Sequence, residues 1–476
     1  MIRRKFNMND GLFFAECSGD YNPIHIDPIV SRRFMFGEPI VHGLHMVLWA
    51  LDVWFDKNEL ANVKIDTLNV TFPKAVVLEK TVTYKLVKEE EDLAVIEIAQ
   101  NDVVCSKIKL KFSEAKGNFS KTLNTGFLKG VAPKEIPKEL SFEKLKTTQG
   151  ALDQYLDESS FSQVFPNVFK HVPKYHIANL LSATRVIGMY CPGLNSLISS
   201  LEFTFDENDI KEERQKYNVT KFDDRFKMLF IDLVAKNFSG KVRTFMRPTP
   251  VDQLNYQDVA KHVKQDEFKG HNVLIVGGSR GLGEITTKIL VAGGASVCFT
   301  YNRGIVDAEK IENELILNNT SAKKLKLDVL NPETYDSFLE NDWVPTHCYY
   351  FATPFIFSGV KGVFSESLFK EFNTVYITAF IRLVSFLKEK GTKNYFYPST
   401  VAIDEMPDNM VEYTISKHSA QKMCEVLIKS DDSLKIKMYK FPRMETDQTV
   451  SFLPVKNHNP LEYTLSFIRS FNSEIS

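Results

Sequence analysis

A repeat in the first half of the chain constrains the fold more strongly than any other feature. The pentad LNVTF ends at Phe72 and the pentad LEFTF ends at Phe205, so the two lie 133 positions apart. Each pentad follows a helical run, and the same offset carries His176 in the second run onto Gly43 in the first. Helix and first strand therefore recur in one order at one spacing, which predicts an internal duplication of a single structural unit.

Each copy has the pattern of an α+β unit. The helical run at 41–55 is apolar nearly all round, which suits a helix wrapped by a sheet. Segments rich in β-branched residues follow it as predicted strands, at 65–72, 80–88, 93–100 and 103–112. The second copy has a helical run from His176 and predicted strands at 197–205, 226–235 and 241–247. We expect each copy to bury its helix against one face of an antiparallel meander.

From about residue 271 the pattern changes to a regular alternation of strands and helices, which predicts an α/β fold with a Rossmann-like, doubly wound parallel sheet. Two stretches, 114–145 and 245–270, accumulate Pro, Gly and Lys and are predicted linkers. The linkers divide the chain into predicted domains at 1–115, 145–247 and 271–476.

The amino-acid composition indicates which partners to expect and in which cellular environment the protein works. The 59 Lys and Arg balance 60 Asp and Glu to a net charge of −1, so we expect neither a nucleic acid nor a membrane as partner. No run of about 18 apolar residues occurs in the sequence. The six Cys are scattered without metal-ligand spacing, which predicts buried thiols, no metal site and a reducing, cytoplasmic environment.

The segment SGDYNPIHID (18–27) places Asp20 and His25 five residues apart in a predicted loop, which can bring both side chains to one point. Such a pair can hold a water molecule, take its proton and return a proton elsewhere, as hydration of an activated double bond requires. In isolation this pattern is more often a turn cap beside a packing histidine. Gly43, in EPIVHGLH, favours the catalytic interpretation instead. It lies near a predicted helix N-terminus, where free N–H groups can receive a developing oxyanion.

SGDYNPIHID followed by FGEPIVHGLH resembles the MaoC-type hydratase/dehydratase family, the (R)-specific 2-enoyl-thioester hydratases of the hot dog fold. The resemblance covers roughly 1–115. It implies that Asp20 and His25 activate the water, that the Gly43 amide polarises the thioester carbonyl, and that Asn22 shapes the loop. The second copy resembles a degenerate hot dog with His176 in the place of Gly43; we expect it to complete a double hot dog and wall the acyl tunnel. A catalytic role for His176 is the less economical alternative.

VLIVGGSRGLGE (273–284) has the order strand, glycine turn, helix start. Gly277 permits the tight turn, Gly281 lets the backbone approach a pyrophosphate, and Gly283 lets the helix pack near the strand. The next strand ends in CFTYNRG, without the acidic residue that NAD enzymes use, whereas Arg280 and Arg303 can reach a 2′-phosphate. NADPH is therefore the predicted cofactor; the alternative is that both arginines are solvated surface residues.

EYTISKHSA places Tyr413 and Lys417 one helical turn apart. A cation beside a phenol is expected to lower the phenol pKa, which makes the hydroxyl a proton donor near neutrality. Thr400, at the end of the predicted strand KNYFYPST, offers a hydroxyl for the substrate oxygen. Asn373, on a helix predicted through 366–390, is expected to anchor a water that relays protons to Lys417.

Together these positions resemble the short-chain dehydrogenase/reductase superfamily over roughly 271–450, most closely its β-ketoacyl-thioester reductases. The resemblance implies catalytic roles for Asn373, Thr400, Tyr413 and Lys417, with Ser399 as the fallback hydroxyl. The chain departs from the family in Thr400, where Ser is usual, and in Phe351-Ala352-Thr353, where Asn-Ala-Gly is usual. The implied cofactor-binding residues are Gly277, Ser279, Arg280, Gly281, Gly283, Arg303, Asp328, Ala352, Tyr413 and Lys417.

Both sites fit one acyl substrate. The predicted function is NADPH-dependent reduction of 3-oxoacyl thioesters to 3-hydroxyacyl thioesters, joined to (R)-specific hydration or dehydration of 2-enoyl thioesters on coenzyme A or an acyl carrier protein. Tethering keeps the shared intermediate local. One alternative is an NADP-dependent reductase of a sugar or other small carbonyl compound with the hot dog part as an acyl-binding or oligomerisation module. Another is a nucleotide-sensing scaffold without activity. Both parent folds usually associate, so we expect a homo-oligomer.

Overall fold

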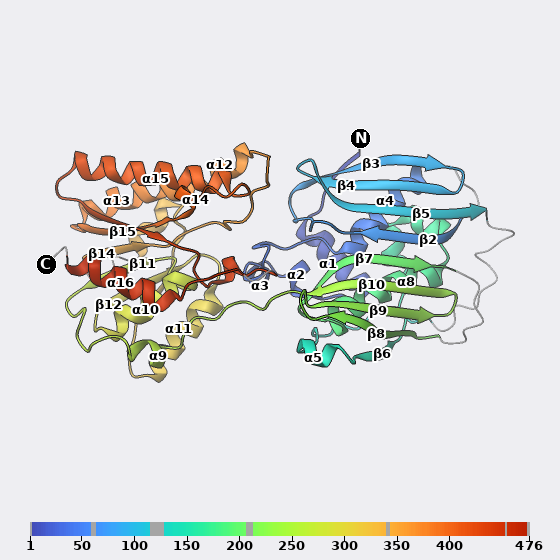
Figure 1. Ribbon diagram of the computed structural model, residues 1–476, viewed down its shortest axis with the longest axis horizontal. Coiled ribbons are helices and arrows are strands. Elements are labelled where there is room, and N and C mark those ends of the chain that lie inside the picture. The colour runs from blue at the N-terminus through green and yellow to red at the C-terminus, as the bar shows by residue number, and fades with distance from the viewer. Residues whose placement is uncertain are drawn as a thin grey trace. The chain divides into compact units, whose positions relative to one another are not determined.

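A computed structural model describes residues 2–58, 63–114, 128–205, 213–338, 343–452 and 455–473. The chain divides into two compact units, Met1–Thr249 and Pro250–Ser476, each with its own sheet (Figure 1). Among the described residues no helix is long and apolar enough to cross a membrane. All six Cys are free and buried, as predicted.

The first unit is built on one antiparallel sheet of ten strands. Strand β2 (Val63–Thr71) pairs with β7 (Ser196–Thr204) at its centre, with Thr67 opposite Thr204. One half continues as β5 (Val103–Glu114), β4 (Leu93–Gln100), β3 (Thr81–Glu90) and β1 (Ile2–Lys5). The other half continues as β10 (Phe238–Met246), β9 (Met228–Ala235), β8 (Gln215–Asp223) and β6 (Gln149–Leu152). The two halves mirror each other outward from the centre, and β7 begins and ends 133 residues after β2.

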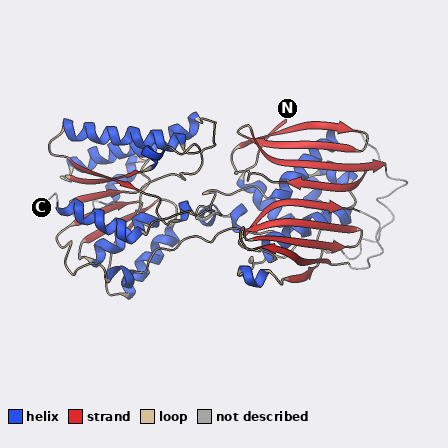
Figure 2. Cartoon of the chain, viewed as in Figure 1, coloured by secondary structure: helices blue, strands red, loops and turns tan. Residues whose placement is uncertain are grey.

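Two long helices pack on this sheet, α4 (Gly43–Lys57) in the first half and α8 (Lys174–Arg185) in the second. Figure 2 shows the helices of this unit gathered on one side of the strands. Helix α4 is buried on nearly every side, as the sequence predicted, and Trp54 is fully enclosed. Helix α8 starts two residues before His176, so the helix starts of the copies do not match at the predicted offset although the first strands do.

Shorter helices surround the pair, and the sequence analysis missed most of them together with β1, β6 and β8. These are α1 (Met8–Ser18), α2 (Pro23–Ile26), α3 (Pro28–Ser31), α5 (Phe142–Leu145), α6 (Glu158–Val164) and α7 (Pro166–His171), with the π-helical turn η1 (Val186–Tyr190) continuing α8. Strand β8 escaped notice because it is half exposed and rich in Lys and polar residues, which weakens its apolar alternation.

The predicted linkers are only partly linkers. Residues 115–127 of the first lie outside the described residues, but Phe142 and Leu145 near its end are buried in the first unit. The boundary between the units does fall inside the second linker, after Thr249. Beyond it, α9 (Tyr256–Ala260) packs Tyr256 and Val259 into the core of the second unit, so most of that stretch is folded.

The second unit contains the predicted doubly wound parallel sheet. Its strand order is β13 (Lys323–Lys326), β12 (Ser296–Tyr301), β11 (Asn272–Val276), β14 (His347–Tyr350), β15 (Asn394–Thr400) and β16 (Lys435–Phe441). The order reverses between β11 and β14, where such sheets form a ligand crevice at the carboxyl ends of the strands. The helices are α10 (Gly281–Ala292), α11 (Ile305–Leu317), α12 (Glu366–Asn373), η4 (Thr374–Ala379), α13 (Phe380–Glu389), α14 (Ala402–Glu405), α15 (Val411–Ser430) and α16 (Pro460–Ser473), with the 3-10 turns η2 (Pro332–Phe338) and η5 (Asp447–Thr449).

Candidate functional site

The segment that carries Asp20 and His25 is held rigidly in the first unit. Helix α1 ends at Gly19, whose φ of 74° is the left-handed conformation that favours glycine. Asn22 caps α2 through Ile24 N–H and donates from Nδ2 to the carbonyl oxygen of Gly188 at 2.9 Å. His25 therefore lies in a single helical turn, where the sequence analysis expected a loop, because Asn22 and Pro23 form a favourable helix start.

The Asp20 carboxyl is buried, and its shortest hydrogen bond comes from helix α8 in the second half of the first unit. Thr184 on α8 donates its hydroxyl to Asp20 Oδ2 at 2.7 Å, and Asn22 N–H donates to Oδ1 at 3.3 Å. Burial raises the pKa of Asp20 to about 7, while these two hydrogen bonds act in the opposite direction. Near neutral pH this group can therefore hold or release a proton.

The His25 ring is arranged as a neutral base. Its Nδ1 lies 2.8 Å from the Ile40 carbonyl oxygen, which can only accept, so Nδ1 carries the hydrogen and Nε2 is unprotonated. The pKa of His25 is lowered to about 4, mainly by burial; the hydrogen bond with Ile40 acts in the opposite direction, and the Arg247 guanidinium adds to the lowering.

Asp20 and His25 converge, and a third side chain joins them. One ligand atom from each of Asp20, His25 and His42 lies within 4.8 Å of the other two. Because no side of this triangle exceeds 4.8 Å, some point lies within about 2.8 Å of all three atoms, which is a hydrogen-bonding distance to water. One water molecule can therefore contact all three groups at once.

Gly43 has the predicted position at the start of α4. As the first helical residue, its N–H has no acceptor within the helix. A Cβ at this position would lie 3.2 Å from the side chains of Phe72 and Ile198, which is tighter than ordinary contact. His176, which lies 133 residues after Gly43 and near the start of α8, is buried against Phe205 at a ring distance of 4.4 Å, and burial lowers its pKa to about 3. Its surroundings are those of a packing histidine.

Several residues of this site were missed by the sequence analysis. His42 was discernible, because it directly precedes Gly43 in the quoted motif. Thr184, Gly188 and Arg247 belong to the second half of the unit, where no motif marks them. A Cβ on Gly188 would lie 2.0 Å from Asp20 Oδ1, so only glycine allows the carboxyl to approach η1.

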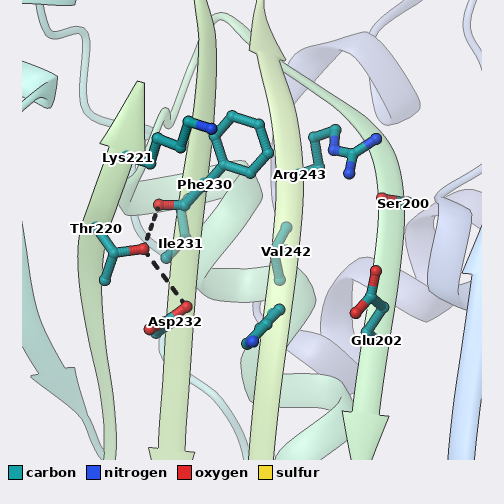
Figure 3. A pocket seen from close by; sticks show the side chains of 10 residues that line it. Ser200, Glu202, Thr220, Lys221, Phe230, Ile231, Asp232, Val242 and Arg243 are labelled. Atoms are coloured by element: carbon teal, nitrogen blue, oxygen red, sulfur yellow. Dashed lines mark hydrogen bonds between the residues drawn. The ribbon is translucent and has the colours of Figure 1, made fainter. Parts of the chain in front are cut away.

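A hollow on the other sheet half, of about 270 Å³, is separate from these residues. Figure 3 shows Phe230 at its rim between Lys221 and Arg243, whose charged groups lie 5.3 Å from the ring centre. None of the residues predicted as catalytic lines this hollow.

In the second unit the glycine turn has the predicted geometry. Gly277 has a φ of 78° and Gly281 starts α10, while a Cβ on Gly283 would lie 2.1 Å from the Gly277 carbonyl oxygen. Ser279 is buried beside this turn. Arg280 lies 3.7 Å from the Asp447 carboxylate, so its charge is partly compensated within the unit.

The other implied cofactor residues follow successive strands. Arg303 is exposed after β12, Asp328 follows β13 and accepts from Leu330 N–H at 3.0 Å, and Ala352 follows β14. Because parallel strands end at one edge, these residues share the edge with the glycine turn. Thr353, in place of the usual Gly, bonds through Oγ1 to the Tyr376 hydroxyl at 2.6 Å.

The pKa of Tyr413 is raised, whereas the sequence predicted that the neighbouring Lys417 would lower it. Burial raises the pKa of Tyr413 to about 12 and lowers the pKa of Lys417 to about 7. The expected lowering of the phenol pKa by the lysine is therefore wrong for this structure. Lys417 Nζ instead donates to the Pro398 carbonyl at 2.8 Å and lies 4.1 Å from the Tyr376 ring centre and 4.9 Å from that of Tyr397.

The two candidate hydroxyls near this pair, those of Thr400 and Ser399, have different hydrogen-bond partners. Thr400 hydrogen-bonds with the Tyr413 hydroxyl, whereas Ser399 donates to Gln421 at 3.3 Å. Thr400 and not Ser399 is thus the hydroxyl beside Tyr413. Asn373 ends α12 at the start of the π-helical turn, and its side-chain amide donates to the Phe369 carbonyl oxygen of its own helix at 2.9 Å.

A family match covers the segment that contains Asp20, His25 and Gly43. Residues 2–107 match the family described as MaoC like domain, so the first unit carries a MaoC-like domain. Over 102 residues the chain is 30% identical to the peroxisomal hydratase-dehydrogenase-epimerase of Saccharomyces cerevisiae, covering 21% of this chain and 11% of that protein. Over 33 residues it is 54% identical to the fatty acid synthase beta subunit stcK of Emericella nidulans, covering 7% and 2%. The matches thus span about a tenth or less of these curated relatives.

Solved structures similar to this chain include a short chain dehydrogenase from Salmonella enterica serovar Typhi. The identity is 16%, with a TM-score of 0.39, covering 44% of this chain and 92% of that one. A putative short chain dehydrogenase from Escherichia coli CFT073, complexed with NADPH, is also 16% identical, with a TM-score of 0.38 and coverage of 44% and 93%.

Proposed function

We propose that this chain is a bifunctional acyl-thioester enzyme that hydrates 2-enoyl thioesters in its first unit and reduces 3-oxoacyl thioesters with NADPH in its second. The observation that carries the hydratase assignment is the convergence of Asp20 and His25 with His42, since one ligand atom from each lies within 4.8 Å of the other two. The MaoC like domain match over residues 2–107 supports the same assignment.

In the proposed hydration the two groups take opposite roles because burial shifts their pKa values in opposite directions. His25 Nε2 takes a proton from water as the water oxygen bonds to C3 of the enoyl chain. The Gly43 N–H hydrogen-bonds to the thioester oxygen, which carries the developing negative charge. Protonated Asp20 then delivers a proton to C2, and its carboxylate is reprotonated by the imidazolium of His25. The (R) configuration of the product is part of this proposal.

The test of the hydratase is turnover of a crotonyl thioester, followed as loss of enoyl absorbance across the pH range. Hydration needs protonated Asp20 and unprotonated His25, so the rate should fall as pH rises through about 7 and fall again as pH declines toward about 4. Absence of turnover, or a rate that stays constant between pH 6 and 9, would contradict the assignment.

For the reductase, the support comes from the second unit. Its glycine turn lies at the N-terminus of α10, a ready site for a dinucleotide phosphate, and Thr400 hydrogen-bonds with Tyr413. Tyr413 would protonate the carbonyl oxygen at C3 of the 3-oxoacyl group, and NADPH, when bound, would supply the hydride. NADPH would lie along Gly277, Gly281 and Gly283, with its 2′-phosphate near Arg280 and Arg303.

The reductase test measures acetoacetyl-thioester-dependent oxidation of NADPH and, separately, of NADH. Thr400→Val should lose about tenfold or more in kcat, because it removes the hydroxyl beside Tyr413. Ser399→Ala is the matched control and should leave the rate unchanged. Equal losses in both variants would contradict the role of Thr400. If NADPH were oxidised with a small carbonyl compound but not with a thioester, the second unit would be a reductase of small carbonyl compounds. The first unit would then serve as an acyl-binding or oligomerisation module.

We also propose that the first unit is a double hot dog made of 1–115 and 145–247. The mirrored strand order about the β2–β7 pair supports this. We expect the full chain to form a homo-oligomer, which sedimentation of the purified protein tests.

A further inference from the structure

His42 occupies a place where three parts of the hydratase site meet. It immediately precedes Gly43 and is the N-cap residue of α4, yet its side chain makes no capping hydrogen bond. Its Nε2 instead lies 3.0 Å from the backbone oxygen of Asp20. Its ring stacks on that of His25, with the ring centres 3.9 Å apart and the planes 25° from parallel. One side chain thus contacts both residues assigned to proton transfer.

The contact with Asp20 fixes the protonation of the His42 ring. A carbonyl oxygen only accepts hydrogen bonds, so Nε2 must carry the hydrogen and Nδ1 keeps its lone pair. Nδ1 is buried and has no partner among the described residues, which leaves an acceptor that a bound water can fill. Burial holds the pKa of His42 well below its ordinary value, and the nearby His25 acts in the same direction, so the ring is neutral.

A histidine that only packs looks different, and the same helix offers one. His45, one turn further along α4, is equally buried but has no hydrogen-bond partner at either nitrogen within the described part of the chain. Its ring stacks on Phe14 at 4.8 Å and meets Phe6 and Phe165 edge-on. His42 differs by holding a backbone carbonyl that lies 22 residues away in sequence.

We infer that His42 is a positioning residue of the water-adding site, which fixes the main chain of Asp20 and the ring plane of His25 relative to the Gly43 amide. The inference rests on the proposed hydratase function. Reacting groups misplaced by about 1 Å can cost about 100-fold in rate, so the loss of such a link should appear in kcat.

The test compares three variants of the full chain in crotonyl-thioester hydration. His42→Phe keeps the stacking ring but loses the donor to Asp20, whereas His42→Gln keeps a donor amide and loses the ring. His45→Phe is the matched control on the same helix. We expect His42→Phe to lower kcat about 10- to 100-fold with KM changed less than about threefold. His42→Gln should recover part of that loss, and His45→Phe should behave as the parent chain.

Two further measurements separate positioning from packing and from failure of the hydratase assignment. The pH–rate profile of His42→Phe should shift relative to the parent, because the Asp20 and His25 environments change. The imidazole titration of His25, followed by NMR, should also shift in His42→Phe and not in His45→Phe, and this readout needs no turnover. Equal kcat, pH profile and His25 titration in His42→Phe and the parent would overturn the inference. If His42→Phe fails to fold, His42→Leu, which removes both the donor and the ring, decides: unchanged kcat and an unchanged His25 titration would overturn the inference. A parent chain without hydration but with a shifted His25 titration in the variant would overturn only the proposed function.

Discussion

The two halves of the first unit share one strand topology but contribute different side chains to the candidate site. The first half supplies Asp20, His25 and Gly43, whereas His176, 133 residues after Gly43 in the second half, packs against Phe205. The second half nevertheless contacts Asp20 through Thr184 and leaves room for it at Gly188. In the proposed hydratase the catalytic groups would therefore come from one half, while the other half holds the Asp20 carboxyl in place through Thr184.

The largest expected effect tests whether the chemistry belongs to the first half. Asp20→Asn and His25→Ala should each lower crotonyl-thioester hydration by about 1000-fold, because general acid–base groups contribute on this scale. NADPH oxidation by the second unit is the internal control and should be unchanged. Retained hydration in either variant would move the active centre away from this half.

A smaller loss should follow from filling the space that the second half leaves for Asp20. In Gly188→Ala the new methyl group would meet Asp20 Oδ1 at 2.0 Å, so the carboxyl must move. We expect a loss of about 100-fold in kcat. Gly130→Ala is the matched control, since a Cβ there meets nothing within 4 Å. Similar kcat in the two variants would show that the second half does not position Asp20.

Removing the hydroxyl of Thr184 should have a milder effect with a defined sign. Its bond to Asp20 Oδ2 favours the carboxylate, so Thr184→Val should raise the pKa of Asp20 above its value of about 7. The alkaline limb of the hydration profile should then move to higher pH, with kcat lowered about tenfold. Ser182→Ala on the same helix is the control, because its hydroxyl has no partner among the described residues. A downward shift of the limb would contradict the assigned contact.

The smallest effect concerns stability and the packing role of His176. Burial lowers its pKa to about 3, so as pH falls below about 6.5 the unfolded chain binds a proton that the folded chain does not. This costs the first unit about 1.4 kcal/mol per pH unit, whereas Asp20, with its raised pKa, acts with the opposite sign. His176→Phe should shift acid unfolding, followed by circular dichroism, to lower pH. An unchanged midpoint would argue against a buried neutral His176.

Sequence reasoning identified the residues that carry local signals. The glycine turn before α10, the run around Asp20 and the apolar helix α4 are short, contiguous patterns whose physics is local. It failed for β8, whose exposed, lysine-rich face obscures its alternation, and for the expected low pKa of Tyr413. Spacing along a helix shows that Lys417 is near Tyr413 but not that its ammonium is directed at the Pro398 carbonyl.

The sequence by itself determined the order of the units, the duplicated strands at an offset of 133, and the side chains available for proton transfer. Only the tertiary structure decided that Thr184 and Gly188 border Asp20, more than 160 residues away, and that His42 links Asp20 to His25. The physical reason is that pKa shifts and close contacts depend on burial and on neighbours from distant segments. A local sequence pattern contains no information about either.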